Sequence, residues 1–186
     1  MKRLIATMCL FILLPSALFG RAQEKPASQP DLKESCRKFV QEFYGWYLAE
    51  ALNKIEAPRD RLALIHKRDA LSVELYRALK ADFDAQANAP EIVGIDFEPF
   101  TNSQDPCEKY AVGEVVQAGE SFRVAVYGIC EGKKHQKPDL VAELKLENGH
   151  WVFLNFHYTN CYGAKGCDLS GILRNLKRER EVSSPK

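Results

Sequence analysis

The spacing of hydrophobic residues changes along the chain, and this change restricts the fold more than any other feature. Between Cys36 and Phe83, apolar residues recur every three or four positions, which is typical of helices with one apolar face. From Cys107 to Tyr158 they largely alternate with polar residues, which is typical of strands. Helices followed by a run of hairpins indicate an α+β fold. We expect N-terminal helices packed on a curved antiparallel sheet, with a short C-terminal helix.

Two helices are predicted before the strands. Asp31 and Glu34 fit a capping box, and an apolar stripe follows them. Ser72 can cap the second helix, which the sequence Asn88–Pro90 ends. Residues 92–97 predict a short strand. The stripe of the first helix consists of Cys36, Phe39, Val40, Phe43, Tyr47 and Leu48.

Turn residues divide the second half of the chain into hairpins. Ala118-Gly119 is a plausible two-residue turn, and Asn148-Gly149 is the strongest hairpin signal in the sequence. The returning strand, Trp151–Tyr158, is apolar on both faces, so we expect it to be central and covered on both sides. Asp168 can cap a last amphipathic helix.

The N-terminus predicts export. Met1–Arg3 is basic, Leu4–Leu14 is almost wholly apolar, and the small residues Gly20 and Ala22 fit a cleavage site. We therefore expect a signal peptide over residues 1–22 and a secreted or periplasmic product. The apolar run is shorter than the ~20 residues that span a bilayer, so no stable membrane insertion is expected.

The mature chain is expected to form one domain. Residues 23–30 are polar and contain proline, which predicts a flexible leader; the α+β domain follows over 31–182, with a tail over 183–186. Cleavage after Ala22 lowers the formal charge from +1 to −2, because the removed segment holds three basic residues and no acidic ones. A nearly neutral chain does not indicate a nucleic-acid binder.

One pair of cysteines can be placed by counting from a turn. Disulfides are the default in an exported chain. If Gln117 pairs with Glu120, Cys107 lies opposite Cys130 as a hydrogen-bonded pair with Cα atoms ~5.5 Å apart, which a bridge can span. A bulge at a glycine of either strand would shift this register.

The other mature cysteines leave alternatives open. Cys161 and Cys167 enclose a short loop with two glycines, which a bridge can close. Cys36 could instead pair with either of them. Five cysteines leave one unpaired, and Cys36 is the candidate free thiol. The Cys161–Cys167 spacing, with His157 four residues earlier, fits neither a zinc motif nor a C-x-x-C redox loop, so we expect no metal and no cofactor.

A ligand pocket is predicted at one end of the last strand. Counting from the Asn148-Gly149 turn places Asn155 opposite Ala142 and His157 opposite Leu140. These two polar side chains would then share an apolar face with Trp151, as in many small-ligand pockets. The alternative is that His157 is a structural histidine with satisfied hydrogen bonds. The full candidate set is Asn155, His157, Trp151, Phe39, Phe43 and Tyr47.

The sequence contains few candidate catalytic residues. Asp96 and Glu98 would share a face of the predicted strand, and paired carboxylates can act as acid and base. The sequence contains neither G-x-S-x-G nor H-E-x-x-H. We therefore expect no catalytic residue and a non-enzymatic domain that binds an envelope protein or a small apolar ligand. The alternative is a small hydrolase or isomerase with His157 or the Asp96/Glu98 pair as general base.

Four stretches together resemble a known family. They are FVQEFYGWYL, LSVELYRALKADFDAQ, DFEPFTNSQDP and AELKLENGHWVFLNFHY. They resemble the exported bacterial domain-of-unknown-function family that includes YbjP-like lipoproteins, over about residues 36–176. The resemblance implies a cystatin-like or nuclear-transport-factor-2-like roll and no established activity, so it transfers no catalytic residue. This chain lacks the lipid-bearing cysteine of the lipoprotein members.

Overall fold

The computed structural model describes residues 28–51, 59–161 and 167–183. The predicted signal peptide and most of the predicted leader and tail lie outside these ranges. The helical elements are α1 (Gln29–Trp46), the π-helical turn η1 (Tyr47–Ala51), α2 (Arg59–His66), the 3-10 turn η2 (Arg68–Ala70), α3 (Val73–Ala87) and α4 (Leu169–Ser183). The strands are β1 (Lys109–Ala118), β2 (Ser121–Cys130), β3 (Lys133–Lys134), β4 (Leu140–Glu147) and β5 (His150–Tyr158).

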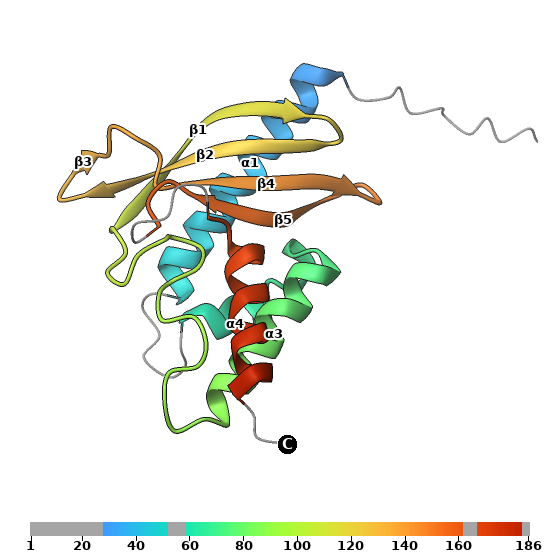
Figure 1. The fold of residues 1–186 in the computed structure, drawn as a ribbon. Coiled ribbons are helices and arrows are strands. Elements are labelled where there is room, and N and C mark those ends of the chain that lie inside the picture. Colours follow the sequence, from blue (N-terminus) through green and yellow to red (C-terminus); the bar gives the residue numbers. More distant parts are fainter. Residues whose placement is uncertain (1–27, 52–58, 162–166, 184–186) are drawn as a thin grey trace, which may run out of the picture.

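The strands form one antiparallel sheet. Its order is β1-β2-β4-β5, and the short β3 pairs with β2. In Figure 1, α1 runs behind the sheet, and α3 and α4 lie side by side below β5. The predicted α+β class is confirmed: helices pack on a curved antiparallel sheet, and a helix ends the fold. Among the described helices, none combines the length and the apolar character needed to cross a membrane.

Helix α1 begins three residues earlier than predicted, with its cap at Ser28 and not at Asp31. Its N-cap is Ser28, whose backbone N–H and hydroxyl both donate to the Asp31 carboxylate, at 3.1 and 2.5 Å. These hydrogen bonds lower the pKa of Asp31. Asp31 is therefore the third-position acid of the first turn and not the cap. The difference arises because Pro30, assigned to the leader, is tolerated in the first turn of a helix.

Helix α3 has the predicted boundaries, but the strand predicted after it is wrong. The Ser72 hydroxyl accepts from the Leu75 N–H at 3.2 Å, and the helix ends before Asn88. Residues 92–97 are irregular. Side chains of α3 accept from three of their amides: Gln86 from the N–H groups of Val93 and Gly94, and Asp82 from the Ile95 N–H at 2.8 Å. Backbone groups paired in this way need no neighbouring strand.

The β1–β2 turn is displaced by one residue from its predicted position. Ala118 pairs with Ser121, and Gly119 adopts a left-handed conformation with φ of +65°. A bulge between Val112 and Val115 then shifts the pairing again toward the start of β1. The predicted register of this hairpin is therefore wrong, although its two strands are correctly placed.

The β4–β5 hairpin has the predicted turn but an unpredicted bulge. Asn148 and Gly149 both have positive φ, +50° and +81°, as a two-residue hairpin turn requires. Leu154 is the extra residue, because Leu144 pairs with Phe153 while Glu143 pairs with Asn155. The predicted pairing of Asn155 with Ala142 is wrong for this reason.

The bulge redistributes side chains between the two faces of β5. His157 pairs with Val141 and not with Leu140. Phe156 and Tyr158 are buried in the core, whereas His157 is only partly buried. Strand β5 thus carries its polar residues on the face opposite to the one that the simple register predicts.

Strand β5 is the last strand of the sheet and not a central one, so that prediction is also wrong. Its outer edge is bridged by Leu71, just before α3, and by Asp168, just before α4. The backbone N–H of Ser72 donates to the Phe153 carbonyl at 2.9 Å. Apolar residues occur on both faces because helices cover an edge strand that would otherwise be exposed.

Aromatic rings form the centre of the core between α1 and the sheet. Phe43 stacks on Tyr47, with ring centroids 5.8 Å apart, and meets Phe153 edge-on at 4.8 Å. Phe100, from the irregular segment, also contacts Phe43. The aromatic density of the first predicted helix therefore serves the interface between α1 and the sheet.

Candidate functional site

The structure does not bring the six predicted pocket residues together. Phe43 and Tyr47 are only 4% and 0% exposed, inside the aromatic core. The Tyr47 hydroxyl donates to the Glu98 carboxylate. These two helix residues therefore hold α1 against the rest of the domain and line no cavity identified in the described residues.

Asn155 caps α4. Its amide nitrogen donates to the Asp168 carboxylate at 2.8 Å, and its side-chain oxygen accepts from the Ser170 N–H at 3.0 Å. Asp168 in turn accepts from the Gly171 N–H at 2.9 Å. The cap predicted at Asp168 is confirmed, and Asn155 completes it from β5. Asn155 therefore has a structural role that its place in the strand pattern did not indicate.

His157 belongs to a polar row across the sheet. Its Nε2 lies 2.7 Å from one oxygen of Glu143, and the Ser121 hydroxyl donates to the other oxygen at 2.8 Å. Burial raises the pKa of Glu143, but the hydrogen bonds from His157 and Ser121 outweigh burial and hold it below its ordinary value. A nucleophile–base pair requires the imidazole to contact the hydroxyl directly. Here the carboxylate lies between them, which supports the structural alternative for His157.

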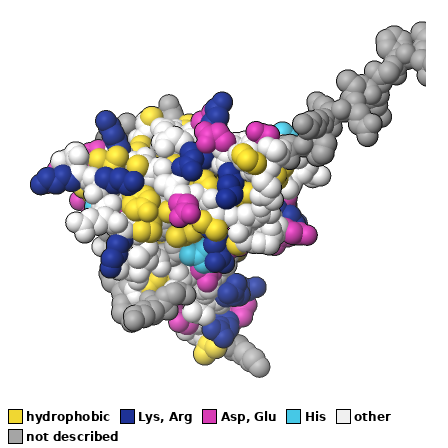
Figure 2. Space-filling model, turned by 90° about the horizontal axis from the view of Figure 1, so that it is seen from above, with side chains coloured by type: hydrophobic (Ala, Val, Ile, Leu, Met, Phe, Trp, Pro, Cys, Tyr) yellow, Lys and Arg dark blue, Asp and Glu magenta, His cyan; other side chains and the backbone are white. Residues whose placement is uncertain are grey.

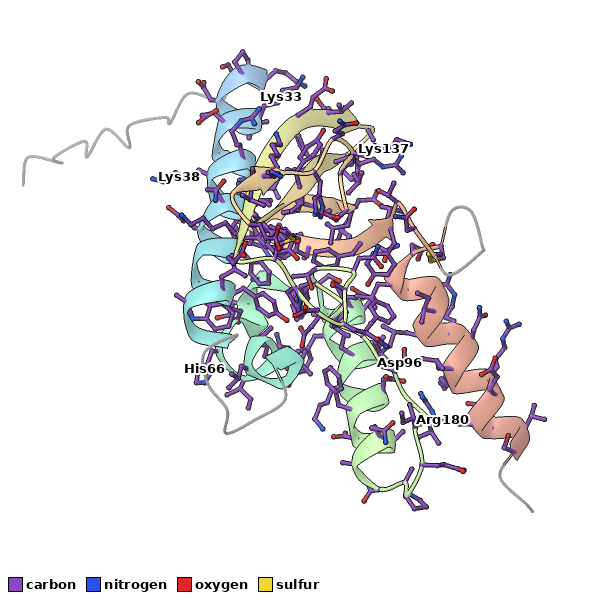
Figure 3. All side chains as sticks on the ribbon, turned by 90° about the vertical axis from the view of Figure 1, so that its left-hand side faces the viewer. Lys33, Lys38, His66, Asp96, Lys137 and Arg180 are labelled. Carbon is purple, nitrogen blue, oxygen red and sulfur yellow. A yellow bond between two sulfur atoms is a disulfide. The ribbon has the colours of Figure 1, made fainter. Side chains whose placement is uncertain are left out.

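The two carboxylates predicted to act as a pair, Asp96 and Glu98, have different surroundings. Glu98 accepts from the Tyr47 hydroxyl, whereas the side chain of Asp96, which Figure 3 labels, is exposed. The two residues lie on no shared strand. Their expected common face therefore does not exist in this fold.

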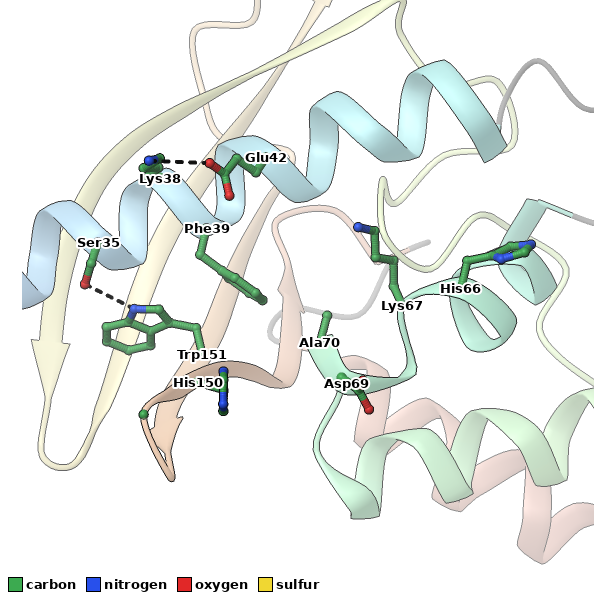
Figure 4. A pocket seen from close by; sticks show the side chains of 11 residues that line it. Ser35, Lys38, Phe39, Glu42, His66, Lys67, Asp69, Ala70, His150 and Trp151 are labelled. Carbon is green, nitrogen blue, oxygen red and sulfur yellow. Dashed lines mark hydrogen bonds and ion pairs between the residues drawn. The ribbon is translucent and has the colours of Figure 1, made fainter.

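Trp151 and Phe39 do line a cavity. Trp151 Nε1 donates to the Ser35 hydroxyl at 3.1 Å, and its ring meets Phe122 edge-on at 5.1 Å. The Phe39 ring packs on Phe153 at 5.3 Å. Core residues thus pack against one side of each ring and hold it in place, and the other side lines the groove drawn in Figure 4.

The groove lies between α1, the β4–β5 turn and the segment that joins α2 to α3 (Figure 4). Its volume is about 570 Å³, within the range of ~300–1,000 Å³ typical of ligand sites. We call it the α1–β5 groove. Its lining consists of Ser35, Lys38, Phe39, Glu42, His66, Lys67, Asp69, Ala70, Gly149, His150 and Trp151.

The rim of the α1–β5 groove carries both signs of charge. Lys38 lies 3.8 Å from Glu42 on the same helix. Lys67 extends over the Trp46 ring, 4.9 Å from its centroid, and Asp69 lies on the same wall. With two lysines and two carboxylates, the rim has no net charge apart from its two histidines. This arrangement gives no electrostatic preference for a strongly anionic or cationic ligand.

Sequence reasoning missed the wall formed by residues 66–70. No motif marks it, because contacts between residues distant in sequence, such as the bridge between Leu71 and Phe153, bring it to the groove. A second, smaller groove of about 400 Å³ lies beside it, between α2 and α3. That groove is lined by Leu64, Ile65, Arg68, Tyr76, Lys80, Phe83, Asp84 and Ala87.

The predicted disulfides are present. Cys107 is bonded to Cys130 and Cys161 to Cys167, with Cα atoms 4.7 and 6.1 Å apart. The first bridge forms despite the wrong register, because Cys107 precedes β1 and is not held in the ladder. Cys36 is unbridged and fully buried, and burial raises its pKa to about 12. The alternative in which Cys36 pairs with Cys161 or Cys167 is therefore wrong.

No family model, no curated protein and no solved structure matches this chain. The α1–β5 groove, with its fixed aromatic floor and neutral rim, is the candidate functional site.

Proposed function

We propose that this protein is a non-enzymatic binding domain and that the α1–β5 groove holds its ligand. The observation that carries the proposal is the pair of rings, Phe39 and Trp151, which form an apolar floor under a polar rim. Apolar walls with a few polar groups are characteristic of small-ligand sites. Because core contacts hold both rings, little conformational entropy is lost when a ligand binds.

The rim indicates the chemical class of the ligand. Opposite charges alternate around the groove, so a neutral or zwitterionic molecule with an apolar body fits it best. The face of the molecule in Figure 2 shows Lys and Arg side chains scattered among hydrophobic and acidic ones, with no continuous basic surface. This distribution does not favour a nucleic-acid partner.

Export forms part of the proposal. Two disulfides support it, since such bridges persist in oxidising compartments. N-terminal sequencing of the secreted protein should begin at Gln23. The α+β architecture also agrees with the roll implied by the resemblance to the YbjP-like family, and we propose membership of that family on this basis.

The test uses a neutral apolar fluorophore, N-phenyl-1-naphthylamine, as the probe. The Trp46→Phe variant leaves Trp151 as the one tryptophan, because the chain contains two. Energy transfer from Trp151 to the bound probe then reports occupancy of the α1–β5 groove. We expect saturable transfer that the Phe39→Ser change weakens by about tenfold, as loss of an apolar ring contact predicts.

The matched control is Tyr76→Ser in the smaller groove. Tyr76 and Phe39 are both partly buried aromatic residues on helices that pack against the same core, so their loss has comparable effects on stability. Probe binding should survive Tyr76→Ser. Equal loss in both variants, or probe binding without transfer from Trp151, would contradict the proposed site.

A further inference from the structure

A second cluster of chemically active side chains lies where β3 folds back on β2, and none of its residues lines the α1–β5 groove. It contains Cys107, Cys130, His135 and Asp139. One potential ligand atom from each of the first three residues lies within 4.8 Å of the other two, and Cys107 Sγ is 3.9 Å from His135 Nε2. In the part of the chain that the structure describes, this is the one such group of three.

Backbone and side-chain bonds fix the histidine of this cluster. The His135 N–H donates to the Gly128 carbonyl, and the Asp139 N–H donates to the Val126 carbonyl, both at 2.9 Å. His135 Nδ1 lies 2.8 Å from the Asp139 carboxylate, which also accepts from the Gly128 N–H at 2.5 Å. With Nδ1 held by a carboxylate, Nε2 is the nitrogen that faces the sulfur.

Gly128 leaves the space in which the cluster sits. A Cβ at this position would lie 2.7 Å from Cys107 Sγ, 2.9 Å from an Asp139 oxygen and 3.2 Å from the His135 ring. Real Cβ atoms essentially never approach other atoms as closely as the first two distances. Three functional side chains, from the segment before β1 and from the β3–β4 connection, therefore converge on one residue that has no side chain.

We propose that Cys107, Cys130 and His135 form a redox-gated zinc site. In the oxidised form the two cysteines are joined in the disulfide and cannot bind the metal. In the reduced form the two thiolates and the imidazole are available as ligands. Two sulfurs and one nitrogen suit Zn²⁺, and three protein ligands leave a fourth position for water. Asp139 would act as a positioning residue, since a carboxylate on the far nitrogen commonly orients a zinc-bound histidine.

The gating step is a two-electron reduction by a dithiol. Cys107 is buried, whereas Cys130 is partly exposed, so the incoming thiolate attacks the sulfur of Cys130 and Cys107 leaves as a thiolate beside His135. The second thiol of the reductant then closes its own disulfide and releases Cys130. The reductant supplies two electrons and two protons. Zinc binding subsequently releases the two thiol protons to solvent.

The experiment titrates Co²⁺, and then Zn²⁺ in competition, into the protein before and after reduction by a phosphine. Thiolate-to-cobalt charge-transfer absorption reports sulfur ligands directly. The reduced protein should bind one equivalent with this absorption, and the oxidised protein should show none. We expect His135→Ala to weaken Co²⁺ binding at least tenfold, and Asp139→Asn to weaken it by about 10- to 100-fold.

Cys161 and Cys167 provide the matched control, because reduction opens both bridges. The double variant Cys161→Ser, Cys167→Ser should bind cobalt as the unaltered chain does. A reduced protein that is folded by circular dichroism but gives no charge-transfer band would overturn the proposal. So would unchanged affinity in His135→Ala, or absorption that follows Cys161 and Cys167. The exposed position of His135 keeps that variant informative even where cysteine replacements fail to fold.

Discussion

At the residue scale, burial governs the reactivity of Cys36. This thiol is fully buried, and the loss of solvation raises its pKa to about 12. Because the thiolate is the reactive form, iodoacetamide should leave Cys36 unlabelled at neutral pH in the folded protein and label it after unfolding in urea. Peptide mass mapping measures the labelled fraction. Rapid labelling under native conditions would show that α1 leaves the sheet far more readily than its packing indicates.

Ionisation of Glu143 makes the stability of the fold depend on pH. Its pKa is lowered in the folded protein from an unfolded value near 4.5. A lowered pKa stabilises the fold above the unfolded pKa, and this contribution disappears as the pH falls through the folded value. Urea unfolding between about pH 7 and pH 3 should therefore show a smaller loss of stability in Glu143→Gln than in the unaltered chain. Parallel curves for the two proteins would contradict this role.

At the element scale, α4 depends on a cap shared between two segments. Asp168→Ala removes the acceptor for the Gly171 N–H and should lower the free energy of unfolding by about 1 kcal/mol. Asn155→Ala should have a similar effect, and the double variant less than the sum, because the two side chains bond each other. Asn175→Ala, exposed on the same helix, is the control and should change stability by less than about 0.5 kcal/mol. Additive effects of the two cap variants would refute a shared cap.

Two local signals were read correctly from the sequence, whereas the cap of α1 and the β1–β2 turn were misplaced. The Asn148-Gly149 turn and the Ser72 cap depend on a few adjacent residues, so their prediction was confirmed. The bulge at Leu154 has no such signature, because an apolar residue fits either face there. That single extra residue misplaced two of the six predicted pocket residues. Another error came from partners distant in sequence, since α3 side chains replace a strand neighbour in the segment 92–97.

At the scale of the whole molecule, one ion pair ties the end of the chain to the middle. Arg180, labelled in Figure 3, bonds the Asp82 carboxylate at 2.5 Å and the Val93 carbonyl at 2.7 Å. The Asp82 side chain is only 1% exposed. Arg180→Ala should therefore lower the free energy of unfolding by about 3 kcal/mol. This value is at the lower end of the range for breaking a buried ion pair, because Arg180 itself is partly exposed.

The control for this prediction lies on α3, the helix that carries Asp82. Lys80 and Asp84 form an exposed pair, and Lys80→Ala should cost less than about 1 kcal/mol. Urea unfolding of both variants gives the comparison. Equal small losses would mean that α4 docks through its apolar face alone.

The covered edge of β5 has a consequence for how copies of this protein meet. A sheet polymerises when an open edge accepts a strand from a neighbour. Here the chain occupies one edge itself, through the bridges of Leu71 and Asp168. At the other edge, Arg37 and Gln41 of α1 donate to the β1 carbonyls of Gly113 and Tyr110. The chain's own groups thus occupy part of both sheet edges, which leaves fewer backbone groups free to accept a strand from a neighbouring copy.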